Sequence, residues 1–500
     1  MRLAALRPGT AGPRAGRPGA GRPDAALKAR LERLQSLHRG LAPWMLFRPE
    51  DSVLILPPNR VYKLGGSGAQ VLAFLGKGGS LADIPGMDAD KASDLERFFA
   101  ELEAASAGRA VALERVPYDF AFTRLPVLGE LALTYRCNER CRFCYAGCGD
   151  APCKGAPAAL PGSALAEGAG RELSTAEAKR IIDLFRDEAK IPFFSFTGGE
   201  PLLRPDLEEL AAYAISRGLR VNLITNGSLA GPERAASLRA AGFDTAQVSL
   251  ESPDPGIHDA LCGVPGAFAR TTAGIRALKA AGISVQTNST VTRENRESLL
   301  RLPAFLKGLG VERFSMNLFI PSGRGLSESG LFVPYSEIGS LVDEVRRLAL
   351  QEGLTFFWYS PTPYCLYNPV ARGLGNKSCA AADGLLHVNP EGQVLPCSSW
   401  PEPLGSLLER PFSEIWFSER AARLKNKTFA PASCSGCPSF VACQGACPLY
   451  WSYAGEAELE GRRGARSSAP AEAGNPAFAE AGRPAPASAG SSAKRSMSHD

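Results

Sequence analysis

Hydrophobic and polar positions alternate with two different periodicities between residues 130 and 358. Short apolar, β-branched or aromatic runs predict strands, and a stretch with helical periodicity follows each of them. The predicted strands are residues 130–135, 193–197, 220–225, 245–250, 284–291 and 313–320. Ser174 predicts a helix N-cap, with Glu177 three residues later. Six strand and helix repeats indicate parallel βα units in an α/β fold, either an open doubly wound sheet or a partly closed barrel.

The segments that flank this repeat have different patterns. Residues 45–110 predict two short strands around a turn at Pro-Pro-Asn, then a helix and a charged amphipathic helix. Residues 1–25 and 456–500 are rich in Gly, Pro, Ala or Ser without apolar periodicity, so both are predicted to be disordered tails. Residues 155–170 have a similar composition and are predicted to be a surface insertion.

Composition narrows the class of protein. A chain of 500 residues with 45% hydrophobic residues is long enough for two or three domains of about 150 residues each. The net charge of +5 is small for this length, so nucleic acid is not the expected partner. No run approaches the roughly 18 apolar residues of a membrane span, and the N-terminus lacks the apolar core of a signal peptide. The expected location is cytoplasmic, without membrane association.

The 13 cysteines are clustered, which favours metal ligands or catalytic thiols over disulfides in a chain without an export signal. Cys137, Cys141 and Cys144 lie in one short loop after the first predicted strand. A closed zinc site uses four protein ligands, whereas three ligands leave a position open for something else. The alternative is a structural zinc site that Cys148 or Cys153 completes.

Polar and glycine-containing motifs end the next three strands, where ligands collect in parallel βα folds. The motifs are Thr197–Pro201 (TGGEP), Thr225–Ser228 (TNGS) and the pair Ser249 and Glu251. Each alone is more typical of an ordinary turn. Because they occur in order on successive strand ends, together they indicate a ligand site.

The motifs CNERCRFCY and TGGEP resemble the signature of the radical S-adenosylmethionine (radical SAM) superfamily over about residues 130–325. The resemblance implies a partial (β/α)6 TIM-type barrel over residues 128–360 and a [4Fe-4S] cluster on Cys137, Cys141 and Cys144. It also implies that the open iron chelates SAM, whose reductive cleavage gives a 5′-deoxyadenosyl radical. An electron donor such as flavodoxin or ferredoxin would be required.

The same resemblance implies roles for the rim residues. Gly198, Gly199 and Glu200 would cradle the SAM ammonium group, and Asn226 would belong to the cofactor site. Ser249 and Glu251 would lie near the ribose. Tyr145 would pack against the cluster or the adenine.

One departure from the family concerns the cation for the SAM carboxylate. Many relatives have HDxxRG after the fourth strand, whereas this chain has HDALCG, with Cys262 in place of the arginine. Arg270 and Arg324 are candidate replacements. His258 is expected to be a surface or capping residue.

The second cysteine group resembles the auxiliary-cluster extension called SPASM, here predicted for residues 361–455. The resemblance implies a first auxiliary cluster on Cys379, Cys397 and Cys447, with Cys365 as the fourth ligand. A second cluster would use Cys434, Cys437 and Cys443. The usual last cysteine is missing, so the second cluster has an open iron, takes an oxygen or nitrogen ligand, or is not formed. A zinc knuckle at residues 434–447 is the alternative.

Residues 45–110 resemble the winged-helix-like PQQ-chaperone domains that bind a leader peptide as an added strand. The alternative is a packing domain without a ligand. The resemblances together imply an enzyme that modifies a ribosomally made peptide. The alternatives are a tetrapyrrole, a haem precursor or another small molecule as substrate, and sulfatase-type protein maturation.

Overall fold

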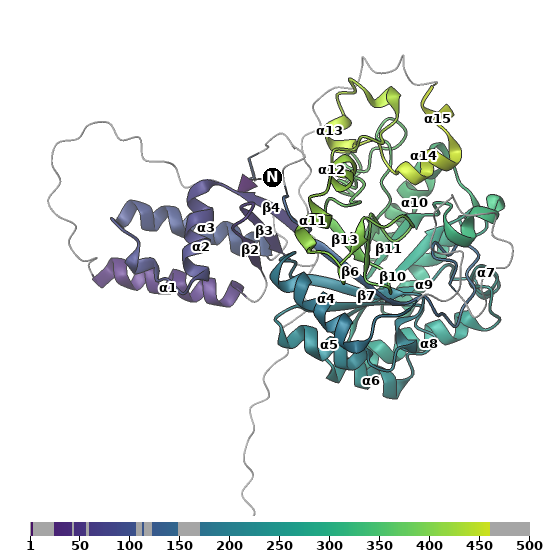
Figure 1. Cartoon of the computed structure of the whole chain (residues 1–500), viewed down its shortest axis with the longest axis horizontal. Helices are drawn as coiled ribbons and strands as arrows, with labels where there is room; N and C mark the ends of the chain where they lie inside the picture. The colour runs from purple at the N-terminus through teal and green to yellow at the C-terminus, as the bar shows by residue number, and fades with distance from the viewer. Residues whose placement is uncertain are drawn as a thin grey trace, which may run out of the picture.

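The computed structural model describes residues 2–3, 25–42, 45–56, 60–106, 113–114, 123–148 and 171–460. Within these ranges a small N-terminal body lies beside a larger body that contains the barrel and the cysteine-rich C-terminal part (Figure 1). The predicted insertion, Cys153 and most of both predicted tails lie outside the described residues. Parts of the tails are ordered: Arg2–Leu3 form strand β1, and helix α15 spans Ala457–Glu460.

The N-terminal body combines a five-stranded sheet, in the order β2-β3-β4-β1-β5, with three α-helices. Its further elements are α1 (Ala25–Leu41), β2 (Leu46–Arg48), β3 (Val53–Leu56), β4 (Arg60–Leu64), α2 (Gly66–Gly76), the 3-10 helix η2 (Leu81–Asp83), α3 (Ala89–Ser106) and β5 (Leu113–Glu114). The two strands, the helix and the amphipathic helix predicted here are β3, β4, α2 and α3.

Helix α1 was not predicted because its apolar stripe is narrow. Only Leu31 and Leu34 of this helix are buried, whereas α3 buries six residues at helical spacing. Helix α1 packs against α3, and a bidentate ion pair joins Arg30 to Glu96 at 2.8 and 2.9 Å. Tertiary packing therefore stabilises α1, although the hydrophobic pattern of this segment does not predict a helix.

A buried arginine connects the N-terminal body to the barrel. Arg48 is 1% exposed and pairs with Asp51 through two hydrogen bonds of 2.7 and 2.9 Å. The same guanidinium donates to the carbonyl oxygens of Leu125 and Pro126, which lead into the first barrel strand. Because this buried charge has a full set of acceptors, it fixes the junction.

The barrel alternates strands and helices as predicted. Its strands are β6 (Leu128–Thr134), β7 (Phe193–Gly198), β8 (Arg220–Thr225), β9 (Thr245–Ser249), β10 (Ser284–Val291), β11 (Arg313–Leu318) and β12 (Thr355–Trp358). Its helices are α4 (Thr175–Asp187), α5 (Leu207–Ser216), α6 (Pro232–Ala240), α7 (Pro255–Cys262), α8 (Ala267–Ala280), α9 (Leu302–Gly308) and α10 (Ile338–Gln351).

Strands β6 to β12 pair in sequence order, and every pair is parallel. The partial barrel is therefore confirmed, with β12 as a seventh strand beyond the six predicted. Ser174 and Glu177 form the expected capping box at the start of α4. Helices cover the outer face of the sheet (Figure 1), so the carboxyl ends of the strands meet at one rim.

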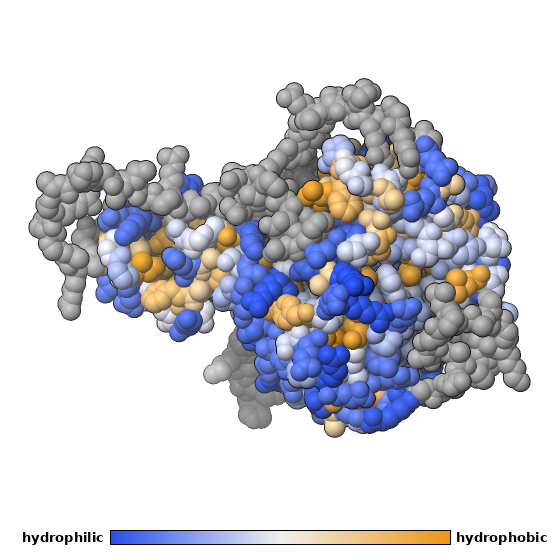
Figure 2. Space-filling view, turned by 45° about the horizontal axis from the view of Figure 1, so that its top comes forward, coloured by the Kyte–Doolittle hydropathy of each residue, from blue (hydrophilic) through white to orange (hydrophobic). Residues whose placement is uncertain are grey.

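The C-terminal part continues the barrel sheet. Strand β13 (Leu385–Val388) pairs parallel with β6, and β14 (Gln393–Leu395) and β15 (Gly405–Ser406) follow antiparallel. The remaining helices are α11 (Phe412–Trp416), α12 (Glu419–Lys425), α13 (Phe440–Cys443) and α14 (Pro448–Ala454). Apolar residues form separate patches on a mostly hydrophilic face (Figure 2). None of the helices described has the length and hydropathy needed to cross a bilayer.

Candidate active site

The loop of residues 135–148, here called the cysteine loop, leaves the carboxyl end of β6 at the rim. Cys137 is buried, whereas Cys141 and Cys144 are partly buried. Burial raises the pKa of the Cys137 thiol, and the nearby Glu200 and Cys141 add to the effect. A hydrogen bond with the Cys148 thiol instead lowers the pKa of Cys144 to about 6. The three predicted ligands therefore lie in one loop and influence one another electrostatically.

The end of α7 holds the middle of the cysteine loop. The backbone N–H groups of Arg140 and Arg142 donate to the carbonyl oxygens of Cys262 (3.0 Å) and Leu261 (2.9 Å). Gly263 adopts a φ of 68°, and a Cβ atom there would lie 2.6 Å from the Arg140 carbonyl oxygen. A side chain at position 263 would thus push the two segments apart.

Arg324 holds the other end of the loop. Its backbone N–H donates to the Cys144 carbonyl oxygen at 3.0 Å. Its guanidinium donates to the carbonyl oxygens of Cys141 (3.4 Å), Gly147 (3.3 Å) and Cys148 (2.7 Å). In this geometry Arg324 is a clamp for the loop rather than a free cation for a ligand carboxylate.

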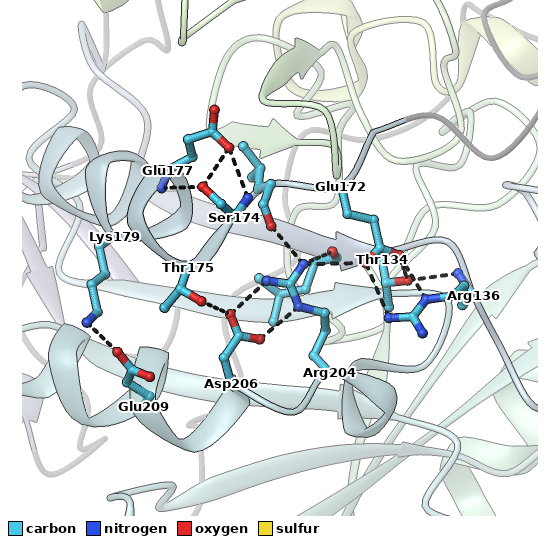
Figure 3. Close-up of polar contacts among 12 residues, drawn as sticks. Thr134, Arg136, Glu172, Ser174, Thr175, Glu177, Lys179, Arg204, Asp206 and Glu209 are labelled. Atoms are coloured by element: carbon cyan, nitrogen blue, oxygen red, sulfur yellow. Dashed lines mark hydrogen bonds and ion pairs between the residues drawn. The ribbon is translucent and has the colours of Figure 1, made fainter.

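Arg204 anchors the start of the loop from below (Figure 3). It is 6% exposed and pairs with Asp206 through two bonds of 2.8 Å. Its third nitrogen donates to the Leu133 carbonyl oxygen in β6. Glu172 reaches Thr134 and Arg136 from the other side. The last residues before Cys137 are therefore held by a charge network that runs from the buried Arg204 to the exposed Arg136.

The TGGEP turn packs directly on the cysteine loop. A Cβ atom at Gly199 would lie 2.2 Å from the Arg136 carbonyl oxygen, and one at Gly198, where φ is 128°, would lie 2.3 Å from that of Thr134. Tyr145 donates its hydroxyl to the Gly198 carbonyl oxygen at 3.4 Å. The glycines are needed because the backbones of the two segments touch.

Three carboxylates are buried at the rim with only neutral hydrogen-bond donors. Glu200 accepts from the Thr225 hydroxyl (2.7 Å) and the Asn226 N–H (2.8 Å), and Glu251 accepts from the Thr290 N–H (2.7 Å). The third is Glu139, which is 2% exposed and has one oxygen, Oε1, without a partner.

These carboxylates fit a cationic ligand. Burial raises the pKa of Glu139 to about 7 and that of Glu251 to about 8, and it also raises the pKa of Glu200. Among the ion pairs of the described residues, none joins a lysine or arginine to any of the three. A bound cation would favour the charged form of these carboxyl groups, so they fit a cofactor such as SAM, which carries an ammonium and a sulfonium group.

The other rim residues lie as follows. Asn226 donates to the Asn138 side chain at 2.9 Å and lies 4.0 Å from the Cys137 sulfur, so it is next to a predicted ligand. Ser249 is partly buried at the end of β9. The prediction for His258 was wrong: its side chain is 1% exposed, and its Nδ1 accepts from the Glu251 N–H at 3.1 Å.

The auxiliary trio, Cys379, Cys397 and Cys447, is assembled from three separate segments of the C-terminal part. Burial and the charge of Cys379 raise the pKa of Cys447 to about 12, and both other thiols act in the same way on Cys397. Lys427 is 2% exposed and donates to the Cys379 carbonyl oxygen (2.7 Å) and to Asp383 (3.1 Å). Sequence reasoning missed this lysine because its partners are more than 40 positions away.

The second auxiliary group, Cys434, Cys437 and Cys443, lies in a loop and a short helix. Cys437 bonds to the Cys434 carbonyl oxygen through its backbone (3.1 Å), and Cys443 is buried. Cys365, predicted to join the auxiliary trio, is exposed. It follows Tyr364, whose N–H donates to the Cys443 sulfur at 3.4 Å.

Comparison with known families agrees with this geometry. Residues 131–306 match the radical SAM superfamily, and residues 379–438 match SPASM, an iron-sulfur cluster-binding domain. The chain belongs to the radical SAM superfamily. Its C-terminal part places it in the SPASM branch, whose members bind [4Fe-4S] clusters in addition to the SAM cluster.

Two kinds of relative are similar in sequence. The AdoMet-dependent heme synthase of Methanosarcina barkeri is 33% identical over 342 residues, which cover 65% of this chain and 92% of that protein. The heme synthase of Nitratidesulfovibrio vulgaris is 31% identical over 63% and 85%. The PqqA peptide cyclase of Xanthomonas campestris pv. campestris is 29% identical over 69% and 91%.

The fold is similar to that of a solved structure. Streptococcus suis SuiB superposes with a TM-score of 0.59 and 16% identity, over 81% of this chain and 95% of SuiB. It has also been solved with the precursor peptide SuiA. At this identity the likeness concerns the fold alone.

Proposed function

We propose that this radical SAM enzyme modifies a ribosomally made peptide, whose leader pairs with β4 of the N-terminal body in the place that β1 takes in this structure. The observation that carries the proposal is the pairing of β4 itself. Residues 2–3, remote in sequence, add to this strand as the parallel strand β1. The side of β4 that pairs with this two-residue segment has the backbone groups to pair with another segment in its place.

The cofactor site would be divided among the chain's own residues. Cys137, Cys141 and Cys144 would hold the [4Fe-4S] cluster, and the Gly198–Glu200 turn would receive the SAM amino group. Tyr145, Asn226, Ser249 and Glu251 would contact the rest of SAM. When bound, these groups supply reductive SAM cleavage and hydrogen abstraction, while the buried rim excludes water from the reacting atoms.

The auxiliary cysteines would hold one or two further clusters, with Cys365 as an additional ligand. The electron would come from a donor such as flavodoxin or ferredoxin. The proposal places the reaction in the cytoplasm, where the thiols remain reduced. The structure shows no disulfide among the cysteines that it describes.

The proposed pairing of a leader peptide with β4 can be tested by removing one backbone N–H donor of that strand. The Leu64 N–H points to β3, because it donates to the Ser52 carbonyl oxygen. The N–H of Lys63 therefore points to the side of β4 that pairs with β1, since successive groups alternate. In the full-length reconstituted enzyme, Lys63→Pro should abolish the peptide-dependent part of 5′-deoxyadenosine release, whereas Lys63→Ala should keep it. Equal peptide stimulation in both variants would reject the proposal.

A tetrapyrrole substrate is the second candidate, and the heme synthase relatives favour it. Those matches leave more than a third of this chain uncovered. The same assay separates the candidates. Stimulation by an iron porphyrin carrying propionate groups, unaffected by Lys63→Pro, would support the second candidate instead.

A further inference from the structure

A fourth buried thiol lies next to the predicted cluster ligands. Cys262, the last residue of α7, is 2% exposed. Its sulfur, the Cys141 sulfur and a Glu139 carboxylate oxygen all lie within 4.8 Å of one another, close enough to share a metal ion. A hydrogen bond joins the two thiols. Cys262 thus reaches the cysteine loop from a different element of the fold.

The surroundings of Cys262 suit a metal-bound sulfur. His258 Nε2 lies 3.5 Å from the Cys262 sulfur. Because His258 Nδ1 accepts from the Glu251 N–H, a neutral ring carries its proton on Nε2 and points this donor at the sulfur. The unpartnered Glu139 oxygen lies in the same buried cluster.

The backbone holds Cys262 in place. Its carbonyl oxygen accepts from the Arg140 N–H at 3.0 Å, and Gly263 lets the two segments touch. These contacts fix the backbone of Cys262 relative to the cysteine loop. A preorganised donor of this kind loses little entropy when it coordinates a metal.

We propose that Cys262 is the fourth protein ligand of the cluster on Cys137, Cys141 and Cys144 when SAM is absent, and that SAM displaces it. The inference rests on the proposed cofactor site. As the iron–sulfur bond forms, the Cys262 thiol releases its proton to solvent. When the SAM amino and carboxylate groups take the iron, the thiolate leaves and is protonated again. No electron is transferred in either step.

Cys148 provides a matched control. It is also buried, and it also neighbours a ligand, because its backbone N–H donates to the Cys144 sulfur at 3.4 Å. Its carbonyl oxygen is held by Arg324, so it belongs to the loop itself. Cys148→Ala and Cys262→Ala each remove one thiol that neighbours a predicted ligand, and both leave Cys137, Cys141 and Cys144 in the chain.

The first experiment measures retention of the fourth iron. Iron and sulfide are counted in the anaerobically reconstituted full-length protein, and limited ferricyanide then removes one electron per cluster. An iron without a protein ligand leaves as Fe²⁺ and produces a [3Fe-4S] signal in electron paramagnetic resonance. We expect about one additional [3Fe-4S] centre per chain in Cys262→Ala compared with wild type and Cys148→Ala. Equal signals in all three proteins, or the extra signal in Cys148→Ala alone, would overturn the proposal.

The second experiment measures SAM affinity of the same proteins by equilibrium dialysis. If SAM must displace a thiolate, Cys262→Ala should bind SAM about tenfold more tightly than wild type and Cys148→Ala. Unchanged or weaker binding contradicts displacement. A protein that binds no iron, or binds iron but does not cleave SAM, would instead show that the proposed function has failed.

Discussion

The cysteine loop and the auxiliary trio present the same side chain but are built differently. The loop carries its three ligands in one segment, and contacts from α7, the TGGEP turn and Arg324 to the loop backbone hold its shape. The trio comes from three segments, and the buried side chain of Lys427 holds the Cys379 carbonyl oxygen. The spacing of the cysteines in the sequence therefore identifies the first site directly, whereas the second site can be recognised only once the fold has brought its three segments together.

Substitution of one predicted cluster ligand in either region should show most clearly that the cysteine loop and the auxiliary trio bind their iron separately. Cys141→Ala should lower SAM cleavage by about a thousandfold or more, because the cluster that reduces SAM is lost. Release of 5′-deoxyadenosine with dithionite measures this. The variant should keep the auxiliary iron. Cys397→Ala should show the reverse pattern, with auxiliary iron lost and SAM binding kept. Loss of all iron in both variants would mean that the two regions do not load independently.

The buried lysine tests the side-chain support of the auxiliary trio. Lys427→Met should lower the free energy of unfolding by about 3 kcal/mol, because it leaves Asp383 buried without its close cation. Urea unfolding measures the change. Lys425→Met is the control, because Lys425 is 3.8 Å from Asp383 and more exposed. Its effect should be below about 1 kcal/mol. Equal effects would show that Lys427 has no special role.

A glycine tests the backbone support of the cysteine loop. Gly263→Ala should cost about 2 kcal/mol, because the residue has a positive φ and the new Cβ meets the Arg140 carbonyl oxygen. It should also lower the iron content of the loop site without changing the auxiliary iron. Gly256→Ala, in the same helix, adds a Cβ at an ordinary 3.4 Å contact. A similar loss of stability in both variants would argue against the backbone contact.

The buried rim carboxylate predicts a pH dependence. Burial raises the pKa of Glu251 to about 8, above the value near 4.5 of the unfolded chain. The unfolded chain therefore releases this proton first, and stability falls as pH rises from about 4.5 to about 8. The slope from this group reaches about 1.4 kcal/mol per pH unit. Glu251→Gln should remove that part of the slope in urea unfolding curves without SAM. Parallel curves for both proteins would show that Glu251 ionises normally.

The difference between the two regions also explains which parts of the fold and of the site could be predicted from the sequence. The six strands, the capping box at Ser174 and the cysteine loop follow from local patterns, and the structure contains all of them. Helix α1 and strand β12 depend on packing against distant elements, so their own patterns were too weak. The burial of His258 was missed because its partner, the backbone of Glu251, becomes a neighbour only after β9 and α7 have folded together. Arg324 could be named as a candidate cation, but its carbonyl partners could not.

The Arg324 clamp has a consequence for how the protein matures. Arg324 is separated by 176 positions from Cys148, whose carbonyl oxygen it holds. A nascent chain that has just exposed its first cysteines at the ribosome therefore lacks the clamp and the end of α7. The loop acquires its final shape only after most of the barrel has been synthesised. Metal insertion into this loop is thus expected to be a late, post-translational event, and the thiols must be kept reduced until then.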